Sequence, residues 1–388
     1  LDICYGYSQL IFDYFCAQYD IKTVFSYQES GTNLSWKIDK KVAIVLQEYN
    51  VKWVQFQRDG ILRGIKNRDG WETNWYHVMH SPVHDNRFSP RRFEPIKNPF
   101  LAPFKIKQNY PFEPKIMQPG GLIPAWQYLQ SFVKGRGFKY HLQLSKPTQS
   151  RSSCGRVSPY LAWGNLSIRQ VYQFLRQHRT LSGKKRPFNA ILTRLKWHCH
   201  FIQKFEVDCS YETQCINKGY ELLEHVHRGD YIDAWEKGQT GYPMVDACMR
   251  CLKKTGWINF RMRAMLVSFF CHNLDQDWRQ GIYHLAQLFL DYEPGIHYPQ
   301  FQMQAGTTGI NTIRMYNPVK QSKDHDPNGV FLKKWVPELV NIPDYCLHEP
   351  WKIKPIDGLL HQFELGKTYP RPIAVSYTHL RAHETKPN

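Results

Sequence analysis

A loop of small residues that leads into a helix, at residues 153–169 (SCGRVSPYLAWGNLSIR), combines the residue types that hold a phosphate group. Cys154 and Gly155 precede Arg156, and Ser158 then opens an apolar run. Glycine lets a ligand approach the backbone closely, and the first amides of a helix point outward without partners. Such amides bind anions, but Ser-Pro before an apolar run is also an ordinary helix cap. The spacing alone leaves both interpretations open.

The part of the chain that must position this loop is predicted to be all-helical. From residue 125 onward, apolar residues recur at a spacing of three and four, which is typical of one buried helix face. The segments that carry this pattern are 125–133, 167–178, 190–205, 243–253, 260–271 and 281–290.

The first hundred residues alternate helix and strand patterns instead. Residues 1–19 and 34–49 are amphipathic, whereas 21–26 (IKTVFS) and 51–56 (VKWVQF) are rich in β-branched and aromatic residues. Strands separated by helix-length segments indicate βαβ units and a parallel sheet. Prolines recur between residues 82 and 124, so we expect an irregular crossover there.

Composition bounds the class of protein and of partner. The 388 residues suffice for two domains, and the formal net charge of +18 indicates a polyanionic partner such as DNA. An anionic surface, or a generally basic protein without such a partner, are the alternatives. The 12 Trp and 23 Tyr suit a large core and stacking on planar ligands.

The cysteines predict no metal site. Cys248 and Cys251 form the one close pair, but they lie within a helical pattern and lack a second pair, which indicates buried thiols. We find no apolar run of membrane-spanning length and no signal peptide, so we expect a reducing, cytoplasmic setting.

The loop at residues 153–169 resembles the flavin-binding signature of the photolyase/cryptochrome family, whose usual form is TSRLSPYLxxGxLSxR. Residues 236–269, 277–293 and 313–339 match further family motifs in the same order. The resemblance covers roughly residues 139–351 and implies FAD as the cofactor. The fold that it implies is a partial α/β, Rossmann-like domain followed by an all-α FAD-binding domain.

The implied division is 1–100 for the partial α/β domain, 101–124 for a Pro-rich linker and 125–373 for the helical domain. Residues 374–388 depart from the family pattern, and we interpret them as an artefactual tail. The α/β domain of relatives can carry an antenna chromophore. Because this chain starts within a helical pattern, we interpret it as a fragment that lacks the first strands, and we do not expect an antenna here.

The resemblance also assigns residues to the flavin. They are Tyr140, Cys154, Gly155, Arg156, Val157, Ser158, Arg263, Asp291, Glu293 and His297. Cys154 and Gly155 stand where Thr and Ser are usual, so backbone amides and Arg156 would hold the pyrophosphate. Arg263 and Asp291 would form a buried pair beside the flavin ring, with a structural ion pair as the alternative. His297 falls at the position that faces the reactive flavin nitrogen, and Glu293 replaces a shorter acid.

A second group of residues corresponds to the family's DNA-binding pocket. Trp197 matches a tryptophan that stacks on the flipped-out pyrimidine pair. Arg194 stands in place of a Glu one turn earlier, Phe260 in place of an Asn, and Met303 in place of a second stacking Trp. The DNA-binding residues that the resemblance implies are Trp197, Arg194, Phe260, Arg261, Met303 and Arg314.

The catalytic residues that the resemblance implies are Trp197 and Trp278. Trp278 matches the middle member of a chain of three tryptophans that carries electrons to the flavin, but Phe301 and His225 stand at the other two places. Phenylalanine relays electrons poorly, so we hypothesise that the usual route is interrupted. The candidate substitutes are Tyr292, Tyr298, Trp235 and Tyr283.

Three functions are compatible with these patterns. The preferred one is photolyase-type repair by a monomer, in which an electron from reduced flavin splits a cyclobutane pyrimidine dimer in DNA and then returns. A cryptochrome-type photoreceptor without repair is the alternative, favoured by the altered pocket. A flavin-free, basic nucleic-acid-binding scaffold is the second alternative. The sequence does not separate cyclobutane from (6-4) lesions.

Overall fold

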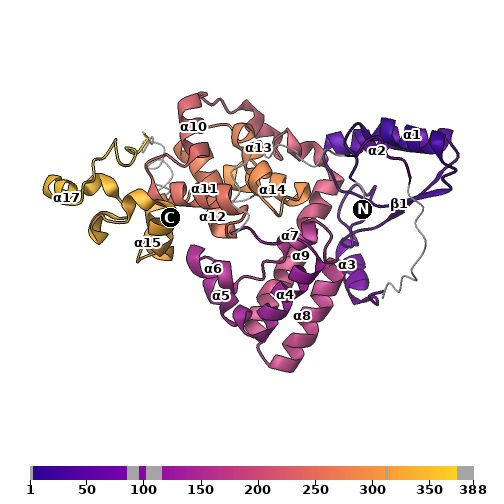
Figure 1. Cartoon of the computed structure of the whole chain (residues 1–388), viewed down its shortest axis with the longest axis horizontal. Coiled ribbons are helices and arrows are strands. Elements are labelled where there is room, and N and C mark those ends of the chain that lie inside the picture. The colour runs from indigo at the N-terminus through magenta and orange to yellow at the C-terminus, as the bar shows by residue number, and fades with distance from the viewer. Residues whose placement is uncertain (1–2, 85–95, 102–115, 311–312, 314, 374–388) are drawn as a thin grey trace.

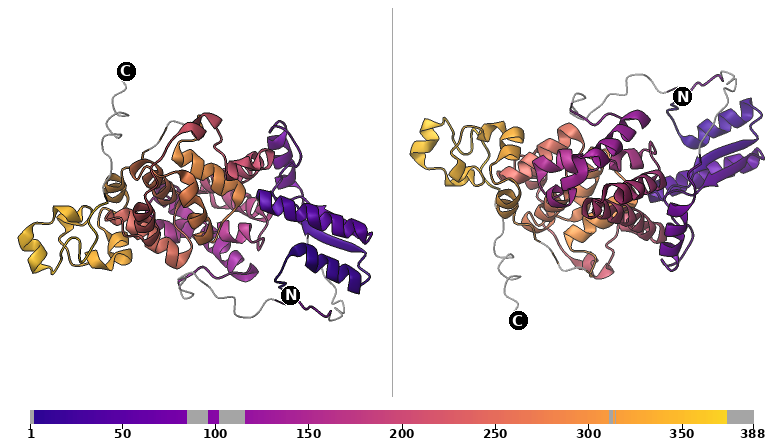
Figure 2. Two further views of the ribbon diagram at one scale, coloured as in Figure 1. Left: turned by 90° about the horizontal axis from the view of Figure 1, so that it is seen from above. Right: turned by 90° about the horizontal axis from the view of Figure 1, so that it is seen from below.

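The computed structural model describes residues 3–84, 96–101, 116–310, 313 and 315–373, and they form a mostly helical chain (Figure 1). The first strands and the last helix lie at opposite ends of an elongated molecule (Figures 1 and 2). Most of the expected linker, Arg314 and the expected tail at 374–388 lie outside the described residues.

The N-terminal part is a small α/β unit. Its elements are α1 (Ser8–Gln18), β1 (Thr23–Tyr27), α2 (Asn33–Glu48) and β2 (Lys52–Phe56). The two strands pair in parallel, with Thr23 opposite Lys52, which confirms the predicted parallel pairing. The two helices pack side by side on one face of the strands (Figure 1). Among the described residues the sheet has only these two strands, so a Rossmann-like domain is only weakly indicated.

A helix that the sequence reading missed, α3 (Trp71–His80), follows this unit. Trp71, Trp75 and Met79 are spaced by four residues and are buried, so they form one narrow apolar stripe. The stripe shares a core with α4 (Leu122–Lys134) and with later helices. The segment before the linker therefore packs against the helical part, and the expected domain boundary at residue 100 stays a prediction.

The helical part contains two buried cores. The first lies around α4, α8 and α9, and the second around α11, α12, α14 and α16. The helices after α4 are α5 (Tyr140–Gln143), α6 (Pro147–Ser153), α7 (Ser158–Ala162), α8 (Ile168–Ser182), α9 (Lys185–Val207), α10 (Gly229–Lys237), α11 (Pro243–Thr255), α12 (Phe260–Ser268), α13 (Trp278–Leu288), α14 (Pro294–Ala305), α15 (Pro318–His325), α16 (Val330–Trp335) and α17 (Pro355–Leu360). Helix α9 packs along α14, and this contact joins the two cores.

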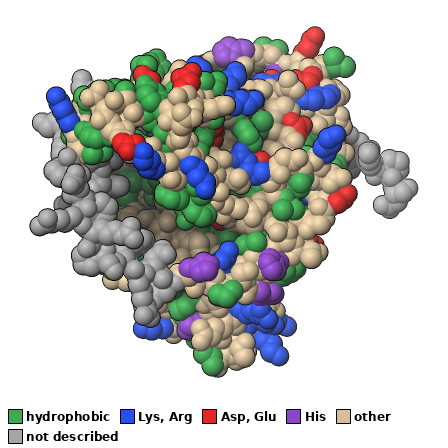
Figure 3. All heavy atoms as spheres, turned by 90° about the vertical axis from the view of Figure 1, so that its right-hand side faces the viewer, with side chains coloured by type: hydrophobic (Ala, Val, Ile, Leu, Met, Phe, Trp, Pro, Cys, Tyr) green, Lys and Arg blue, Asp and Glu red, His purple; other side chains and the backbone are tan. Residues whose placement is uncertain are grey.

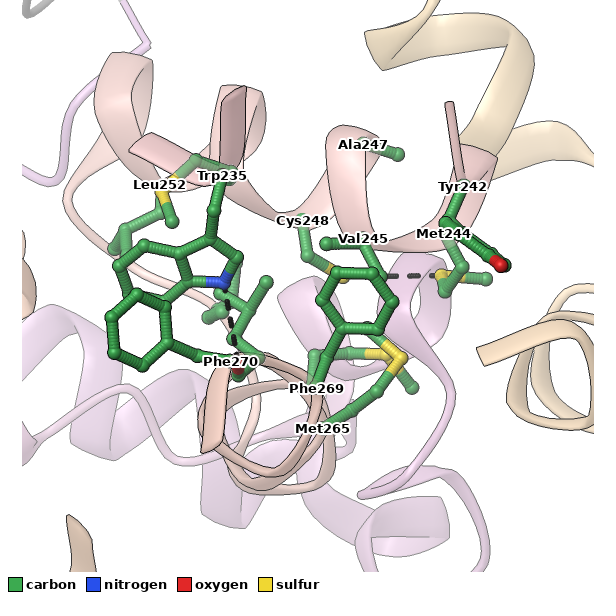
Figure 4. Close-up of a cluster of buried hydrophobic side chains, with 14 of the residues drawn as sticks. Trp235, Tyr242, Met244, Val245, Ala247, Cys248, Leu252, Met265, Phe269 and Phe270 are labelled. Carbon is green, nitrogen blue, oxygen red and sulfur yellow. Dashed lines mark hydrogen bonds between the residues drawn. The ribbon is translucent and has the colours of Figure 1, made fainter. Parts of the chain in front are cut away.

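The second core packs α10, α11 and α12 against one another (Figure 4). Trp235 is fully buried, and its indole donates a hydrogen bond to the carbonyl of Leu266 at 3.2 Å. Cys248 and Cys251 are also fully buried, and burial raises the pKa of both thiols. The Cys-x-x-Cys pair therefore fills the core as neutral thiols.

Candidate functional site

A cavity of about 320 Å³ lies between the two cores, within the range of small-molecule sites. Nine of the residues assigned to the flavin line it: Tyr140, Cys154, Gly155, Arg156, Val157, Ser158, Arg263, Asp291 and His297. Three residues assigned to DNA binding also line it: Arg194, Trp197 and Phe260. Segments more than 100 residues apart in the sequence thus meet at one hollow. Glu293, Arg261 and Met303 are not part of its lining.

The loop between α6 and α7 places a buried cation in the cavity wall. Arg156 has a left-handed backbone (φ 57°), which is strained for a residue with a side chain. Gln118 holds this conformation from both sides, since it donates to the Arg156 carbonyl at 2.6 Å and accepts from Nε at 3.1 Å. The sequence reading missed Gln118, because its residue type in a Pro-rich segment carries no signal.

The guanidinium of Arg156 has no carboxylate partner within ion-pair distance in the described part of the chain. It is only 7% exposed and lies 4.0 Å from the ring centre of Trp257. Burial, followed by repulsion from Arg151, lowers the pKa of Arg156 to about 10, so it stays charged at neutral pH. A buried cation without a counter-ion is unfavourable unless a ligand supplies the negative charge.

A side chain at Gly155 would require the end of the Ile191 side chain to shift. A Cβ atom there would lie 2.7 Å from Cδ1 of Ile191, on α9. Cys154 beside Gly155 is buried, and burial raises the pKa of its thiol to about 12, so the thiol is neutral. The loop therefore places the Arg156 guanidinium and a neutral thiol in the cavity wall, and its assignment to the pyrophosphate stays a prediction.

The carboxylate of Asp291, with two hydrogen-bond donors, forms another part of the cavity wall. Arg263 Nη2 donates to Oδ2 of Asp291 at 2.9 Å, and the Ser158 hydroxyl donates to the same oxygen at 2.7 Å. Burial raises the pKa of Asp291, but Arg263 and these hydrogen bonds outweigh burial and lower it overall, so the group is a carboxylate. Its other oxygen, Oδ1, has no hydrogen-bond partner among the described residues. The sequence reading placed Ser158 with the phosphate loop and did not foresee its bond to Asp291.

His297 lines the cavity as a neutral imidazole. Its Nε2 lies 2.9 Å from the Ile282 carbonyl, which assigns the ring proton to this nitrogen and leaves Nδ1 as an acceptor. Burial lowers the pKa of His297 to about 4. The ring packs against Phe289 and Phe301, so its orientation is fixed.

Glu293 turns away from the cavity. Its carboxylate lies 3.6 Å from Nη2 of Arg58, which also donates to the Leu161 carbonyl at 3.0 Å. Burial raises the pKa of Glu293 to about 7. In this structure Glu293 thus links the segment after β2 to the helical part and does not lie with the other residues assigned to the flavin.

Three further polar side chains in the cavity wall have an unpartnered buried atom. These atoms are His198 Nε2, Asn259 Nδ2 and Gln300 Oε1, and none of them has a hydrogen-bond partner in the part of the chain that the structure describes. The sequence reading missed all three residues. Only Asn259 carried a signal, because it caps α12 by accepting from the Met262 amide at 3.1 Å.

The model of a known family matches residues 191–385, half of this chain, and its description is the FAD-binding domain of DNA photolyase. The chain belongs to the DNA photolyase family. The match includes Arg263 and Asp291, whereas the loop with Arg156 lies before it.

Individual relatives of this photolyase-family chain carry two kinds of name. A deoxyribodipyrimidine photo-lyase of Alkalihalophilus pseudofirmus is 34% identical over 255 residues, which are 64% of this chain and 51% of the relative. A cryptochrome DASH of Synechocystis is 33% identical over 296 residues, 74% of this chain and 60% of the relative. The chain therefore spans about half to three fifths of the length of these curated relatives.

Solved structures establish the fold. A cryptochrome of Synechocystis superimposes with a TM-score of 0.82 at 22% identity and covers 99% of this chain and 83% of its own. A class III photolyase of Agrobacterium tumefaciens gives a TM-score of 0.79 at 22% identity and covers 97% and 81%. The photolyase/cryptochrome-like fold expected from the sequence is thus confirmed.

The residues of this photolyase-family chain fit FAD. The unpaired Arg156 cation suits a pyrophosphate, while the wall around Asp291 suits a flat ring with both donors and acceptors. Phe289 and Phe301 add apolar surface between the polar groups. FAD is also the cofactor that the description of the family model names.

The mouth of the cavity carries the residues assigned to DNA. Trp197 is 50% exposed and Phe260 is 46% exposed. The guanidinium of Arg194 lies 4.8 Å from the ring centre of Trp197 and so covers part of the tryptophan face. Met303 lines a neighbouring hollow, which shares Trp197 with the cavity. Arg261 lies in the first turn of α12, is half-buried and lines neither hollow.

The residues considered for electron transfer separate into two groups. Trp278 is buried but does not line the cavity, and the described residues give its ring no contact with Phe301 or another aromatic ring. His225 pairs with Asp275 at 3.0 Å. By contrast, ring contacts connect Tyr283, which is 47% exposed, to Tyr298 at 6.3 Å and then to cavity-lining His297 at 5.5 Å.

Tyr292 and Trp235, which were hypothesised to replace the missing members of the tryptophan chain, lie in different places. The Tyr292 hydroxyl donates to the Tyr298 hydroxyl at 3.2 Å, so Tyr292 belongs to the group that reaches the cavity. Trp235 packs on Phe270 in the second core and does not line the cavity.

The described helices include none long and apolar enough to cross a membrane. Among the same residues, no three His, Cys, Asp or Glu side chains gather in a way that would hold a metal ion.

Proposed function

We propose that this chain binds FAD in the cavity and repairs cyclobutane pyrimidine dimers in DNA with light, as a monomer. The observation that carries the proposal is that one cavity brings together the unpaired Arg156 and the Arg263–Asp291 pair. The names of the relatives support it, since several are deoxyribodipyrimidine photo-lyases.

When bound, FAD supplies the light-driven electron transfer that splits the dimer. The chain holds the pyrophosphate with Arg156 and the amides around it. Arg263 and Asp291 place a fixed cation and a fixed anion beside the ring, and neutral His297 offers Nδ1 to it as an acceptor. The apolar side chains Phe289 and Phe301 keep water from that end of the cavity.

DNA is the proposed partner because the chain has a formal net charge of +18 and an aromatic mouth. Lys and Arg side chains are spread over the face that Figure 3 shows, which also has a hollow. Trp197 would stack on the extruded pyrimidines, and Arg194 would contact a flanking phosphate. Phe260 would pack beside them, and Arg261, Met303 and Arg314 are retained as proposed DNA contacts.

The finer architecture also belongs to this proposal. Residues 1–100 would be part of a Rossmann-like α/β domain, 101–124 a linker and 125–373 the FAD-binding domain. The ring contacts from Tyr283 through Tyr298 support an electron route that bypasses Trp278.

A cryptochrome-type photoreceptor is the second candidate, and one observation favours it. Arg194 lies over the face of Trp197 that a pyrimidine would need. A flavin-free scaffold is less well supported, because Arg156 would then remain a buried cation without a counter-ion.

Illumination of the reduced, FAD-loaded chain with a dimer-containing oligonucleotide tests the proposal. Repair restores the ultraviolet absorbance of the pyrimidines, and Trp197→Ala should lower this recovery while FAD stays bound. A chain that binds FAD but restores no absorbance would support the photoreceptor, and one that binds no FAD would support the scaffold.

A further inference from the structure

We infer that Arg136 is a positioning residue for the phosphate half of FAD: it holds the loop after α6 so that the loop amides face the cavity. This inference rests on the proposed function. Arg136 lies in the turn between α4 and α5, outside the cavity lining, and no family motif drew attention to it.

The guanidinium of Arg136 uses all of its donors. Nε donates to the Ser131 hydroxyl at 3.0 Å, and Nη2 donates to the Tyr128 carbonyl at 2.9 Å, so two bonds fix the side chain to α4. The remaining donors reach the carbonyl of Ser152 in the last turn of α6 and the loop carbonyls of Cys154 and Gly155. Five bonds from five N–H groups leave this cation fully satisfied.

Because the peptide bond is planar, these contacts also fix the direction in which the loop amides point. In a trans peptide the N–H of one residue points opposite to the carbonyl of the residue before it. Because the carbonyls of Cys154 and Gly155 point at Arg136, the amides of Gly155 and Arg156 point away from it. Neither amide has an acceptor among the described residues.

The backbone at this point has the form of an anion-binding nest. Arg156 is left-handed (φ 57°), and Val157 after it is right-handed helical (φ −92°, ψ −13°). Successive amides in alternating hands form a concave cluster of donors, which suits a phosphate. Arg136 thus orders the amides of a cavity that its own side chain does not line.

Arg136 also packs against two aromatic rings of α4. Its guanidinium lies 5.6 Å from the ring centre of Tyr128 and 5.9 Å from that of Phe132. A role in packing alone would predict that its loss weakens every ligand of the cavity alike. A role in positioning the amides predicts a selective loss, because only ligands with phosphate groups use them.

The test uses three probes on the full chain with its cofactor removed: FAD, ADP and riboflavin. ADP has the diphosphate without the flavin ring, and riboflavin has the ring without a phosphate. Arg136→Gln should weaken FAD and ADP at least tenfold and leave riboflavin within twofold. Hydrogen exchange of the hydrogen-bonded amides at residues 152–154, at the end of α6, should quicken. The control is Lys139→Gln, which removes an exposed charge from the same turn.

Arg136→Lys keeps the charge but loses the planar guanidinium with its five donors, so it should weaken FAD and ADP less than Arg136→Gln does. If the Gln variant does not fold, the Lys variant provides the test. Equal weakening of all three probes, or unchanged ADP affinity, would overturn the inference. Failure of the unaltered chain to bind FAD would instead overturn the proposed function, and the exchange rates would then show whether Arg136 orders the loop at all.

Discussion

Arg263 and Asp291, which are 28 residues apart in the chain, meet at 2.9 Å in the wall of the candidate cavity. The pair joins α12 to the turn before α14, and its carboxylate keeps one oxygen without a partner in the described chain. The arrangement is stable only while Arg263 supplies the counter-charge, and it leaves Asp291 an acceptor for a ligand.

Asp291→Asn should destabilise the chain and weaken FAD binding. Asparagine keeps the shape but leaves Arg263 without its counter-charge, which we expect to reduce the free energy of unfolding by about 2 kcal/mol. The pKa of Asp291 is lowered in the folded state, so the unaltered chain should lose this stability as the pH falls below about 4. Denaturant unfolding at neutral and acid pH measures both effects. A variant with unchanged stability and unchanged FAD content would contradict the assignment.

Gly155→Ala should destabilise the chain by about 1 kcal/mol, because its Cβ would lie 2.7 Å from Cδ1 of Ile191, and that methyl group must shift. Ile191→Val removes that carbon atom and should by itself lose about 1 kcal/mol. The double variant should therefore be more stable than the sum of the two losses implies, as a double-mutant cycle would measure. Strict additivity would show that the contact does not limit this position.

Trp197→Ala should weaken binding of dimer-containing DNA by about 1–3 kcal/mol, the usual value of one stacked base, while FAD content stays the same. Tyr27→Ala, which removes an exposed ring on β1, is the matched control. Equal affinities for the two variants would exclude Trp197 from the DNA site.

Arg194→Gln should change the salt dependence of DNA binding. If Arg194 contacts one phosphate, the slope of log K against log salt should fall in magnitude by about 0.9. An unchanged slope with altered FAD affinity would assign Arg194 to the cofactor.

Glu293→Gln should change how stability depends on pH. The folded pKa of Glu293 is raised to about 7, so the unaltered chain should lose stability as the pH rises from about 4.5 through 7. Each unit of pKa shift corresponds to about 1.4 kcal/mol. The Gln variant should therefore gain stability relative to the unaltered chain at pH 8 and not at pH 5. Glu48→Gln, at an exposed site of α2, serves as control, and parallel profiles for all three proteins would refute the burial of Glu293.

The sequence predicted what depends on local pattern and on motif. The parallel pairing of β1 and β2 followed from two β-rich segments separated by a helix, and the helical part followed from its apolar spacing. The resemblance predicted that Arg156, Arg263 and Asp291 meet at one cavity, and they do. Residues that match a family's motifs occupy corresponding places in the shared fold.

The remainder depended on contacts that no local pattern records. Ser158 binds Asp291 across 133 residues, and Glu293 turns toward Arg58. Helix α3 escaped notice because its apolar stripe is one residue wide. The role of Arg136 could not be predicted for another reason. Its partners after α4 are backbone carbonyls, which every residue has, so no residue type marks them in the sequence.

The most direct test of the account is an FAD titration of the cofactor-free chain, followed by flavin fluorescence, for the unaltered protein and for Arg156→Gln. The account predicts saturable binding of one FAD for each chain, with the affinity reduced at least tenfold by Arg156→Gln because the buried cation meets the pyrophosphate. No binding by the unaltered chain, or equal affinity in both proteins, would contradict it.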